Sequence, residues 1–287
     1  MTLQKIFRWL SRLSLPTLHR LGATAGLATY GLSKSYRRRL RANMTLAIQR
    51  APSSHELHAA ACEAGKLLFE LPYVWLRPYA QMLSHVVEVE GWEVMDAFAA
   101  NATPVLALTP HLGCFEIVAA YIGSRVPMTA LYRPPKRADL EPIMRAGRER
   151  GLIKLAPADL SGVKRLLRAL RQGEIAGLLP DQVPGNGEGM WSGFFGKPAY
   201  TMTLAARLSE AEGVRVVLFW GERLSGGRGY RIHVCEPAEA ITGSLEQRVQ
   251  AINREVERLV LRCPTQYLWG YNRYKIPAGA LPPGRSA

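Results

Sequence analysis

One histidine and one carboxylate stand close together in the chain, in a setting that suits acid–base chemistry. His111 and Glu116 are the first and last residues of the segment His-Leu-Gly-Cys-Phe-Glu, which follows an apolar run that ends at Pro110. An imidazole that acts as a base needs one nitrogen free to accept a proton and the other held by a partner, and a carboxylate provides that hold. The pattern predicts His111 as a general base and Glu116 as the acid that orients it.

The geometry of a helix restricts how these two side chains can meet. Within one regular helix, a step of five residues would place them about 140° apart. We therefore expect His111 in the turn before a helix, from which its ring can fold back toward Glu116. The group that this pair would activate is a substrate hydroxyl, because no serine stands in a G-x-S-x-G elbow. Cys114 remains open as an alternative nucleophile, although small uncharged side chains commonly fill such turns.

The elements that position this segment are expected to alternate between strands and helices. Apolar or β-branched runs predict strands at residues 104–109, 126–131, 175–179, 214–219 and 230–234. Amphipathic stretches predict helices at residues 115–123, 138–150, 159–171, 201–212 and 244–262. This order predicts an α/β sandwich, in which loops at the carboxyl ends of strands usually carry the chemistry.

The first 55 residues carry a strong and one-sided charge. They contain ten Lys or Arg residues and no Asp or Glu, in a chain whose net charge is +14. At about 100° per residue, the first basic residues fall on one side of a helix and the large apolar residues on the other. The basic side carries Lys5, Arg8 and Arg12, and the apolar side carries Leu3, Ile6, Phe7, Leu10 and Leu13. This pattern is typical of a helix that lies in a membrane interface.

A mostly apolar stretch follows at residues 21–32, and arginines at 37–39 come after it. The stretch is too short to span a bilayer, and it lacks the cleavage site of a signal peptide. The position of the arginines favours attachment to the cytoplasmic side of a membrane. The alternative is a basic solvated helix that only packs on the domain. The four cysteines form no CxxC pair and no cluster with histidines, so we expect a reduced compartment and no metal site.

Several short motifs make the chain resemble a known family. After the His-x4-Glu box at residues 111–116 come a Tyr-Arg-Pro element, a Gly-Arg pair, a Pro-Asp element, a Phe-Phe-Gly segment and a Gln-Tyr-Leu-Trp element. They are found here as Tyr132-Arg133-Pro134, Gly147-Arg148, Pro180-Asp181-Gln182, Phe194-Phe195-Gly196 and Gln266 to Trp269. In this order they resemble the bacterial lipid A biosynthesis late acyltransferases, the lauroyl and myristoyl transferases, over nearly the whole chain.

The resemblance implies a fold, an activity and partners. The implied fold is α/β, a mixed and mostly parallel sheet flanked by helices as in glycerol-3-phosphate acyltransferases, with a basic membrane-associated helical segment at its start. The implied activity transfers an acyl chain from acyl carrier protein, the donor substrate, to a hydroxyl of a lipid A precursor at the cytoplasmic face of the inner membrane. No cofactor is implied. The expected partners are acyl carrier protein, the lipid A precursor and anionic inner-membrane lipid, and not nucleic acid.

The same resemblance divides the chain and assigns its site residues. Residues 1–40 are expected to form the membrane-associated segment, 41–276 the acyltransferase domain and 277–287 a loose tail. His111 and Glu116 match the family's catalytic pair, while Arg133, Arg148 and Asp181 are expected to bind substrate. Arg148 suits an oxyanion or a phosphate, because a guanidinium forks onto oxygen pairs, and Asp181 is expected to hold that arginine. From the residues alone, a solvated charge on a helix face is the favoured interpretation of Arg148, and the alternative for Asp181 is a turn or helix-cap carboxylate.

Two departures from the family pattern leave the acceptor and the chain length open. Cys114 and Phe115 stand where many members have Asn and Trp, and the sequence at 271–273 is Tyr-Asn-Arg in place of His-Arg-Arg. The glycine-rich residues 185–189 are expected to form a mobile loop at the site. The aromatic residues at 191, 194 and 195 either line an acyl groove or belong to the core.

Three other functions compete with this interpretation. The same pair can serve an acyltransferase that acts on a glycerol phosphate, a lysophospholipid or an aminolipid, with coenzyme A as donor. An isoelectric point of about 10.0 is compatible with nucleic-acid binding. Neither a helix-turn-helix nor base-stacking aromatics accompany the basic residues, which disfavours that function. A catalytically inactive membrane scaffold is the third.

Overall fold

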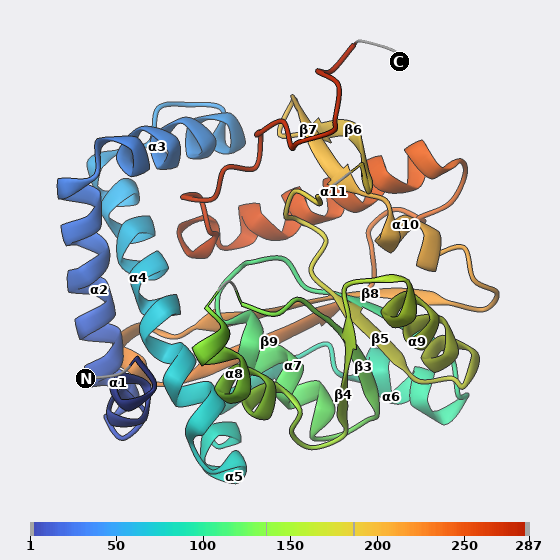
Figure 1. The fold of residues 1–287 in the computed structure, drawn as a ribbon, viewed down its shortest axis with the longest axis horizontal. Coiled ribbons are helices and arrows are strands. Elements are labelled where there is room, and N and C mark those ends of the chain that lie inside the picture. Colours follow the sequence, from blue (N-terminus) through green and yellow to red (C-terminus); the bar gives the residue numbers. More distant parts are fainter. Residues whose placement is uncertain (1–2, 136, 186, 285–287) are drawn as a thin grey trace.

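The computed structural model describes residues 3–135, 137–185 and 187–284, and a seven-stranded sheet forms its centre (Figure 1). The strands lie in the order β1-β9-β8-β2-β5-β3-β4. All neighbours are parallel except β8 and β9, which are antiparallel. The strands are β1 (Val86–Glu90), β2 (Val105–Leu108), β3 (Met128–Tyr132), β4 (Ile153–Pro157), β5 (Ile175–Leu178), β8 (Arg215–Arg223) and β9 (Tyr230–Cys235).

Helices precede the sheet and connect its strands. They are α1 (Leu3–Leu10), α2 (Leu15–Leu32), α3 (Lys34–Ile48), α4 (Ser54–Leu76), α5 (Tyr79–Leu83), α6 (Glu93–Ala100), α7 (Phe115–Gly123), α8 (Glu141–Arg148), α9 (Leu160–Arg171), α10 (Leu204–Leu208) and α11 (Leu245–Arg262). Short 3-10 turns lie at Ala138–Leu140, Ser225–Gly227 and Pro264–Gln266. The predicted mixed, mostly parallel sheet flanked by helices is confirmed.

The sheet separates two hydrophobic cores, because successive side chains of a strand point to opposite faces. Leu106 and Leu108 of β2 belong to a core that includes residues of α3, α9 and α11. Val105 and Ala107 of the same strand belong to the other core, which includes residues of α4, α7 and α8. Helices therefore cover both faces, and four consecutive apolar residues are needed in this central strand.

The sequence missed two strands and a hairpin. Strands β1 and β4 were not predicted, and neither was the pair formed by β6 (Gly189–Phe194) and β7 (Lys197–Met202). The helix predicted at residues 201–212 is shorter in the structure: its first two residues end β7, and only α10 (Leu204–Leu208) is helical. The Phe-Phe-Gly segment supplies the turn of this hairpin, with φ of 46° at Phe195 and 72° at Gly196. Two consecutive positive φ values match the twist of the flanking strands.

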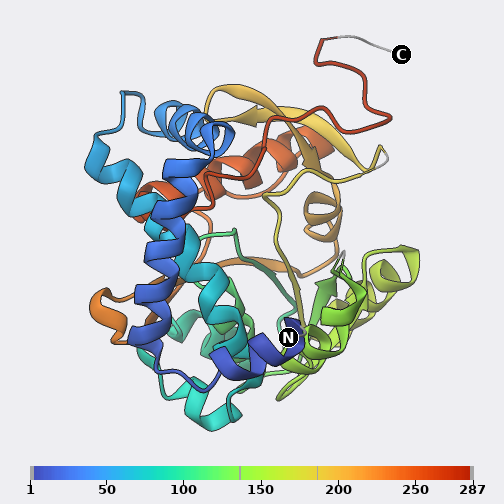
Figure 2. The same ribbon diagram turned by 60° about the vertical axis from the view of Figure 1, so that its left-hand side comes forward.

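The helix α2 is built onto the domain through a close contact with α4. A Cβ atom at Gly22 would lie 2.7 Å from the backbone oxygen of Gly65, and one at Gly26 would lie 2.0 Å from that of Ala61. Small residues at this spacing let two helix backbones approach each other. The two helices lie side by side in both views (Figure 2). The predicted boundary at residue 40 falls within α3.

The surface of the N-terminal helices that does not contact α4 carries apolar side chains. Leu32 is 87% exposed and Trp9 is 55% exposed, and Leu21 and Leu27 are also exposed. Among the described helices, none combines the length and the apolar character that crossing a membrane requires. At the other end of the chain, the Trp191 indole donates a hydrogen bond to the backbone oxygen of Leu281, over 2.8 Å. Residues 285–287 of the predicted tail lie outside the described residues.

Candidate functional site

The register of two parallel strands brings His111 and Asp181 together. Leu108 of β2 pairs with Leu178 of β5, and each chain continues three residues beyond its paired leucine to reach the histidine or the aspartate. The carboxyl ends of parallel strands meet at one edge of a sheet. Asp181 Oδ1 lies 2.8 Å from His111 Nδ1, and Asp181 Oδ2 accepts a hydrogen bond of 2.9 Å from the His111 backbone N–H. One carboxylate thus orients both the ring and the backbone of His111.

This pairing decides which nitrogen of His111 is basic. The Asp181 side chain is 2% exposed. Burial by itself would raise the pKa of the Asp181 carboxyl, but its interactions with the His111 ring and backbone lower that pKa below the ordinary value. An ionised carboxylate only accepts hydrogen bonds, so His111 Nδ1 carries the proton and Nε2 has the free lone pair. The side-chain nitrogen of Gln182 lies 2.9 Å from Nε2 and donates to it.

The expected hydrogen bond between His111 and Glu116 is wrong. Glu116 instead accepts from the Trp75 indole over 3.0 Å and from Arg148 Nε over 3.1 and 3.0 Å. A further bond from Arg148 Nη2 completes a fork. The expected pair of Asp181 with Arg148 is also wrong. Asp181 binds His111 and Glu116 binds Arg148, so each carboxylate has the partner that was expected for the other. Glu116 lies in the first turn of α7, where Arg148 at the end of α8 faces it, while the strand register directs His111 to Asp181.

A close helix contact explains the Gly-Arg pair. A Cβ atom at Gly147 would lie 2.4 Å from the Cβ of Trp75, so only glycine lets α8 approach α4 this closely. The guanidinium of Arg148 then lies 5.7 Å from the ring centres of both Trp75 and Tyr132. Its Nη1 makes no hydrogen bond to the described residues and can donate to a substrate oxygen.

The turn after β2 is held by the Gln-Tyr-Leu-Trp element. The Gly113 backbone N–H donates to the Gln266 oxygen over 3.0 Å, and the Leu268 N–H donates to the His111 oxygen over 3.2 Å. Gly113 has a φ of 59°, and a Cβ there would lie 1.9 Å from the Gly221 oxygen. Sequence reasoning listed Gln266 only as part of a motif, and its role in supporting the turn has no local signal.

Cys114 is poorly placed to act as a nucleophile. Its side chain is fully buried in the core that includes residues of α4, α7 and α8. Burial raises the pKa of its thiol well above the ordinary value, which disfavours the reactive thiolate. Its backbone N–H donates to the Gly221 oxygen over 2.7 Å, as a further support of the turn.

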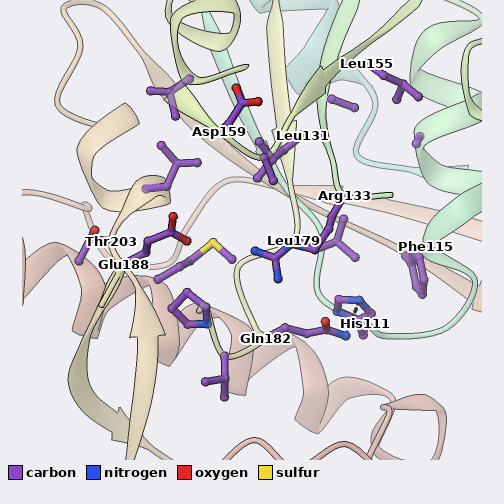
Figure 3. Close-up of a pocket in the computed structure, with 18 of the residues that line it drawn as sticks. His111, Phe115, Leu131, Arg133, Leu155, Asp159, Leu179, Gln182, Glu188 and Thr203 are labelled. Atoms are coloured by element: carbon purple, nitrogen blue, oxygen red, sulfur yellow. Dashed lines mark hydrogen bonds between the residues drawn. The ribbon is translucent and has the colours of Figure 1, made fainter. Parts of the chain in front are cut away.

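An apolar cavity of about 710 Å³ opens beside these residues (Figure 3). Four of the five predicted site residues line it, namely His111, Glu116, Arg133 and Arg148. Asp181 lies behind His111, outside the lining. The guanidinium of Arg133 extends toward the middle of the cavity (Figure 3). Apolar side chains form much of the remaining wall, among them Ala119, Ala130, Leu131, Ile153, Leu155, Leu160, Val163, Leu179, Val183, Met202 and Leu204.

The aromatic residues after the glycine-rich segment do not line this cavity. Phe194 is buried in the core that includes residues of α3, α9 and α11, and Phe195 packs against that core. The interpretation of these rings as a groove is therefore wrong, and the alternative of a core position holds for Phe194. Gly187 and Glu188 do line the cavity. Residue 186 lies outside the described residues, and the mobility of this segment stays a prediction.

The fold and the site define an α/β protein that holds an imidazole–aspartate pair and an arginine–glutamate pair against one apolar cavity. Comparison with known proteins gives the family. The family of bacterial lipid A biosynthesis acyltransferases matches residues 4–276, and the chain belongs to that family. It is therefore an acyltransferase of lipid A biosynthesis by family.

Relatives of known activity are similar over much of their length. The lipid A biosynthesis lauroyltransferase of Escherichia coli (strain K12) is 24% identical over 276 residues, 94% of this chain and 89% of the relative. The lipid A biosynthesis palmitoleoyltransferase of the same strain is 26% identical over 220 residues, 75% of this chain and 70% of the relative. A lipid A biosynthesis acyltransferase of Haemophilus influenzae is 28% identical over 188 residues, 63% and 57% of the two chains.

Proposed function

We propose that the protein transfers a fatty acyl chain from acyl carrier protein to a hydroxyl group of a lipid A precursor. The observation that carries this proposal is the basic Nε2 of His111 at the wall of an apolar cavity, with its Nδ1 held by Asp181. The family membership supports the reaction class. The donor, the acceptor and the roles of the side chains are parts of the proposal.

The His111 imidazole acts as the general base. The acceptor hydroxyl replaces the Gln182 amide at Nε2, and Nε2 takes the hydroxyl proton as the oxygen attacks the thioester carbon. Asp181 stabilises the imidazolium that forms. The C–S bond then breaks, and the leaving thiolate takes the proton from Nε2. The products are the acylated lipid and the free thiol of the carrier, and His111 returns to its neutral form.

Arg148 stabilises the negative charge that develops on the thioester oxygen. Arg148 lines the cavity, and Glu116 holds its guanidinium through Nε and Nη2, so that Nη1 is left to donate to the substrate. A donor that is fixed before the reaction needs no reorganisation when the charge develops, and this kind of stabilisation is worth about 10²- to 10³-fold in kcat. Glu116 therefore acts through Arg148. Arg133, whose guanidinium extends over the cavity, binds an anionic group of one substrate.

The apolar part of the cavity receives the acyl chain. Its wall is built from β3, β4, α9, α10 and neighbouring loops, and its volume lies within the range of ligand cavities, about 300–1,000 Å³. The exposed apolar residues of α2 and the basic residues of the first 55 positions support the proposed attachment to the cytoplasmic face of the inner membrane, because anionic lipid attracts Lys and Arg.

The purified full-length chain tests the proposal. We expect acyl transfer from acylated carrier protein to a lipid A precursor, detected as a mass increase of one fatty acid less one water. Matched reactions with acyl coenzyme A, and with a lysophospholipid as acceptor, separate this activity from that of a related acyltransferase. His111→Ala is expected to abolish transfer. Turnover by folded His111→Ala, or faster transfer to the lysophospholipid, would contradict the proposal.

A further inference from the structure

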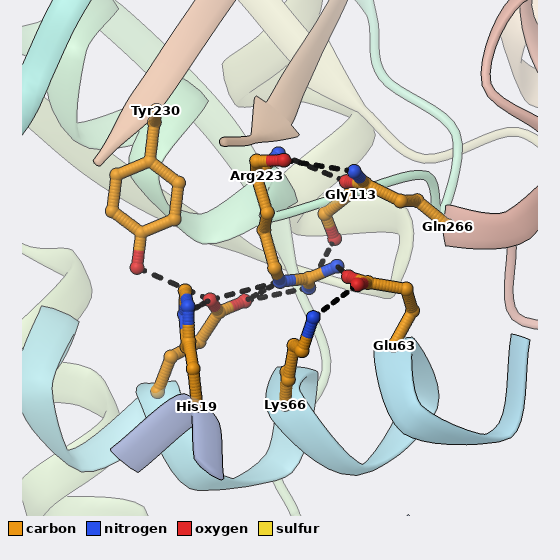
Figure 4. Close-up of polar contacts among 8 residues, drawn as sticks. His19, Glu63, Lys66, Gly113, Arg223, Tyr230 and Gln266 are labelled. Atoms are coloured by element: carbon orange, nitrogen blue, oxygen red, sulfur yellow. Dashed lines mark hydrogen bonds and ion pairs between the residues drawn. The ribbon is translucent and has the colours of Figure 1, made fainter. Parts of the chain in front are cut away.

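A second polar cluster lies beside the His111 turn, and none of its residues lines the cavity (Figure 4). Its centre is the ion pair of Glu70 on α4 with Arg223 at the end of β8. Arg223 Nε donates to both Glu70 oxygens over 3.0 and 2.9 Å, and Nη2 donates over 2.6 Å. The two side chains are 0% and 1% exposed. The ion pair is thus buried, and two nitrogens of the Arg223 guanidinium bind the Glu70 carboxylate.

Three further side chains bind the central pair. His19 Nε2, from α2, lies 3.2 Å from Glu70 Oε2, and the Tyr230 hydroxyl donates to the same oxygen over 3.1 Å. Arg223 Nη1 donates to Glu63 over 3.4 Å, and Glu63 also pairs with Lys66. Burial alone would raise the pKa of Glu70, but Arg223 and His19 lower it to about 2. The carboxylate is therefore charged throughout the neutral range.

The cluster is joined to the catalytic turn through Gly113. Arg223 Nη2 donates to the Gly113 backbone oxygen over 2.7 Å. The Gly113 N–H donates to the Gln266 backbone oxygen, and the side chain of Gln266 binds the Arg223 backbone in both directions, over 2.9 and 3.0 Å. The Gly113 carbonyl is therefore bound by Arg223 itself, and the Gly113 N–H is bound by Gln266, whose side chain is bound to the Arg223 backbone. Gly113 is two positions from His111.

Stability alone is a weak reason for such a cluster. Burying two charges costs solvation energy, and a well-packed apolar pair of similar volume is often as stable. An ionised donor can, however, hold a carbonyl oxygen with a strong and directional hydrogen bond. The turn needs such a hold, because Gly113 has a left-handed backbone and glycine is the most flexible residue. A displacement of about 1 Å at a reacting group can cost about 10²-fold in rate.

We propose that Arg223, oriented by Glu70, is a positioning residue that fixes the His111 turn through the Gly113 carbonyl. His19 extends this connection to α2, so the packing of the N-terminal helix and the geometry of the turn are coupled. The inference rests on the proposed function, in which His111 is the base. Arg223 itself does not line the cavity.

The first variant is Arg223→Lys, which keeps a positive charge beside Glu70 but cannot fork onto Glu70 and reach Gly113 at once. We expect kcat to fall by at least about tenfold with little change in KM, because the reacting geometry and not substrate binding is disturbed. Hydrogen exchange at the Gly113 and Cys114 amides is expected to accelerate by a similar factor. This second readout does not depend on the substrates.

The matched control is Glu222→Gln, at the neighbouring position of the same strand. The Glu222 side chain pairs with Arg231 and His233 and, among the described residues, makes no hydrogen bond or ion pair to the turn. We expect its kcat and its exchange rates in the turn to stay within about twofold of the wild type, since partly exposed ion pairs contribute little. The difference between the two variants then reports the Gly113 contact and not the loss of an ion pair in general.

The link to α2 is tested with His19→Gln. We expect a smaller decrease of kcat, about threefold, and faster exchange at Gly113, and its effects should be non-additive with those of Arg223→Lys. Circular dichroism shows whether Arg223→Lys folds. If it does not, kcat and hydrogen exchange are measured on His19→Gln and Glu63→Gln, which remove only outer contacts of the cluster. Wild-type behaviour of folded His19→Gln would overturn the coupling to α2.

The outcomes separate the positioning role from the proposed function. A folded Arg223→Lys variant with the kcat and the exchange rates of Glu222→Gln would overturn the positioning role. Faster hydrogen exchange at the amides of the turn, together with a lower kcat, supports it. Turnover by His111→Ala would overturn the proposed function, and with it the catalytic half of this inference, while the exchange rates would still report whether Arg223 holds the turn.

Discussion

At the scale of single residues, the chemistry depends on which carboxylate holds which cation. Asp181 holds the His111 ring, and Glu116 holds the Arg148 guanidinium. Both carboxylates are needed under the proposed mechanism, but they act in different steps. Asp181 orients the base and stabilises the imidazolium, whereas Glu116 fixes a donor for the oxyanion.

Substitution of the two carboxylates distinguishes these roles. We expect Asp181→Asn to lower kcat by about 10³- to 10⁴-fold, because an amide cannot stabilise the imidazolium and can favour the wrong tautomer. Glu116→Gln is expected to cost about 10²-fold, because the neutral amide holds Arg148 less firmly. Steady-state kinetics of both variants test this order. Glu149→Gln, which removes a carboxylate from the partly exposed pair with Arg145, is the control. A larger loss in Glu116→Gln than in Asp181→Asn would favour Glu116 as the partner of the base.

At the scale of secondary structure elements, close backbone contacts place the functional side chains. The parallel register of β2 and β5 brings His111 to Asp181. The contact of Gly147 with Trp75 lets α8 present Arg148 to the cavity. These contacts act through the backbone, so their failure displaces a whole element and not one atom.

Gly147→Ala tests the contact between α8 and α4. The added methyl would meet the Cβ of Trp75 at 2.4 Å, so we expect α8 to move outward and the protein to lose about 1–3 kcal/mol of stability. Because Arg148 follows directly, kcat should also fall. Gly31→Ala, in α2, is the matched control, since a Cβ there meets nothing within 4 Å. Urea unfolding measures the stability of both variants, and steady-state kinetics measure their kcat. Equal stability of the two variants would contradict this account of Gly147.

The ion pair between α4 and β8 predicts how stability depends on pH. The folded protein lowers the pKa of Glu70 from 4.5 to about 2. A lowered carboxyl pKa contributes stability above the unfolded value, and this contribution is lost as pH falls toward the folded value. We expect the stability difference between wild type and Glu70→Gln to be constant above about pH 4.5 and to shrink between pH 4.5 and 2 by roughly 3 kcal/mol. Urea unfolding across this range measures it, and a difference that does not change with pH would contradict the assignment.

At the scale of the whole molecule, the N-terminal helices have two different faces. One face of α2 packs on α4 through glycine contacts, and another exposes leucines and lies near basic residues. Removing residues 1–40 would uncover α4 and remove His19 from the buried cluster. Point substitutions on the exposed face therefore test membrane attachment more cleanly than truncation does.

We expect the triple variant Leu21→Ser, Leu27→Ser and Leu32→Ser to move the protein from the membrane fraction to the soluble fraction without lowering its melting temperature by more than a few degrees. Exposed apolar side chains contribute to binding at a lipid interface but little to the core. The control substitutes exposed leucines on other surfaces, Leu152 and Leu261, by Ser. A triple variant that stays with the membrane would show that another surface anchors the protein.

The sequence by itself determined the class of fold, the family and the candidate residues of the site. Buried strands and amphipathic helices have local periodicity, and His111, Glu116, Arg148 and Asp181 lie in short motifs, so each could be found without coordinates. The elements it missed are short strands. Strand β1 pairs with β9 and β4 with β3, whereas β6 and β7 pair with each other across the Phe-Phe-Gly turn.

Only the tertiary structure decided which residues meet. Asp181 lies 70 positions from His111, and the two become neighbours because two parallel strands pair in one register. The nearer carboxylate in the sequence, Glu116, faces α8 instead. The Glu70–Arg223 cluster joins residues 153 positions apart and has no motif of its own. Distances along the chain constrain local structure, whereas hydrogen-bond partners depend on how the elements pack, and that packing is a property of the whole fold.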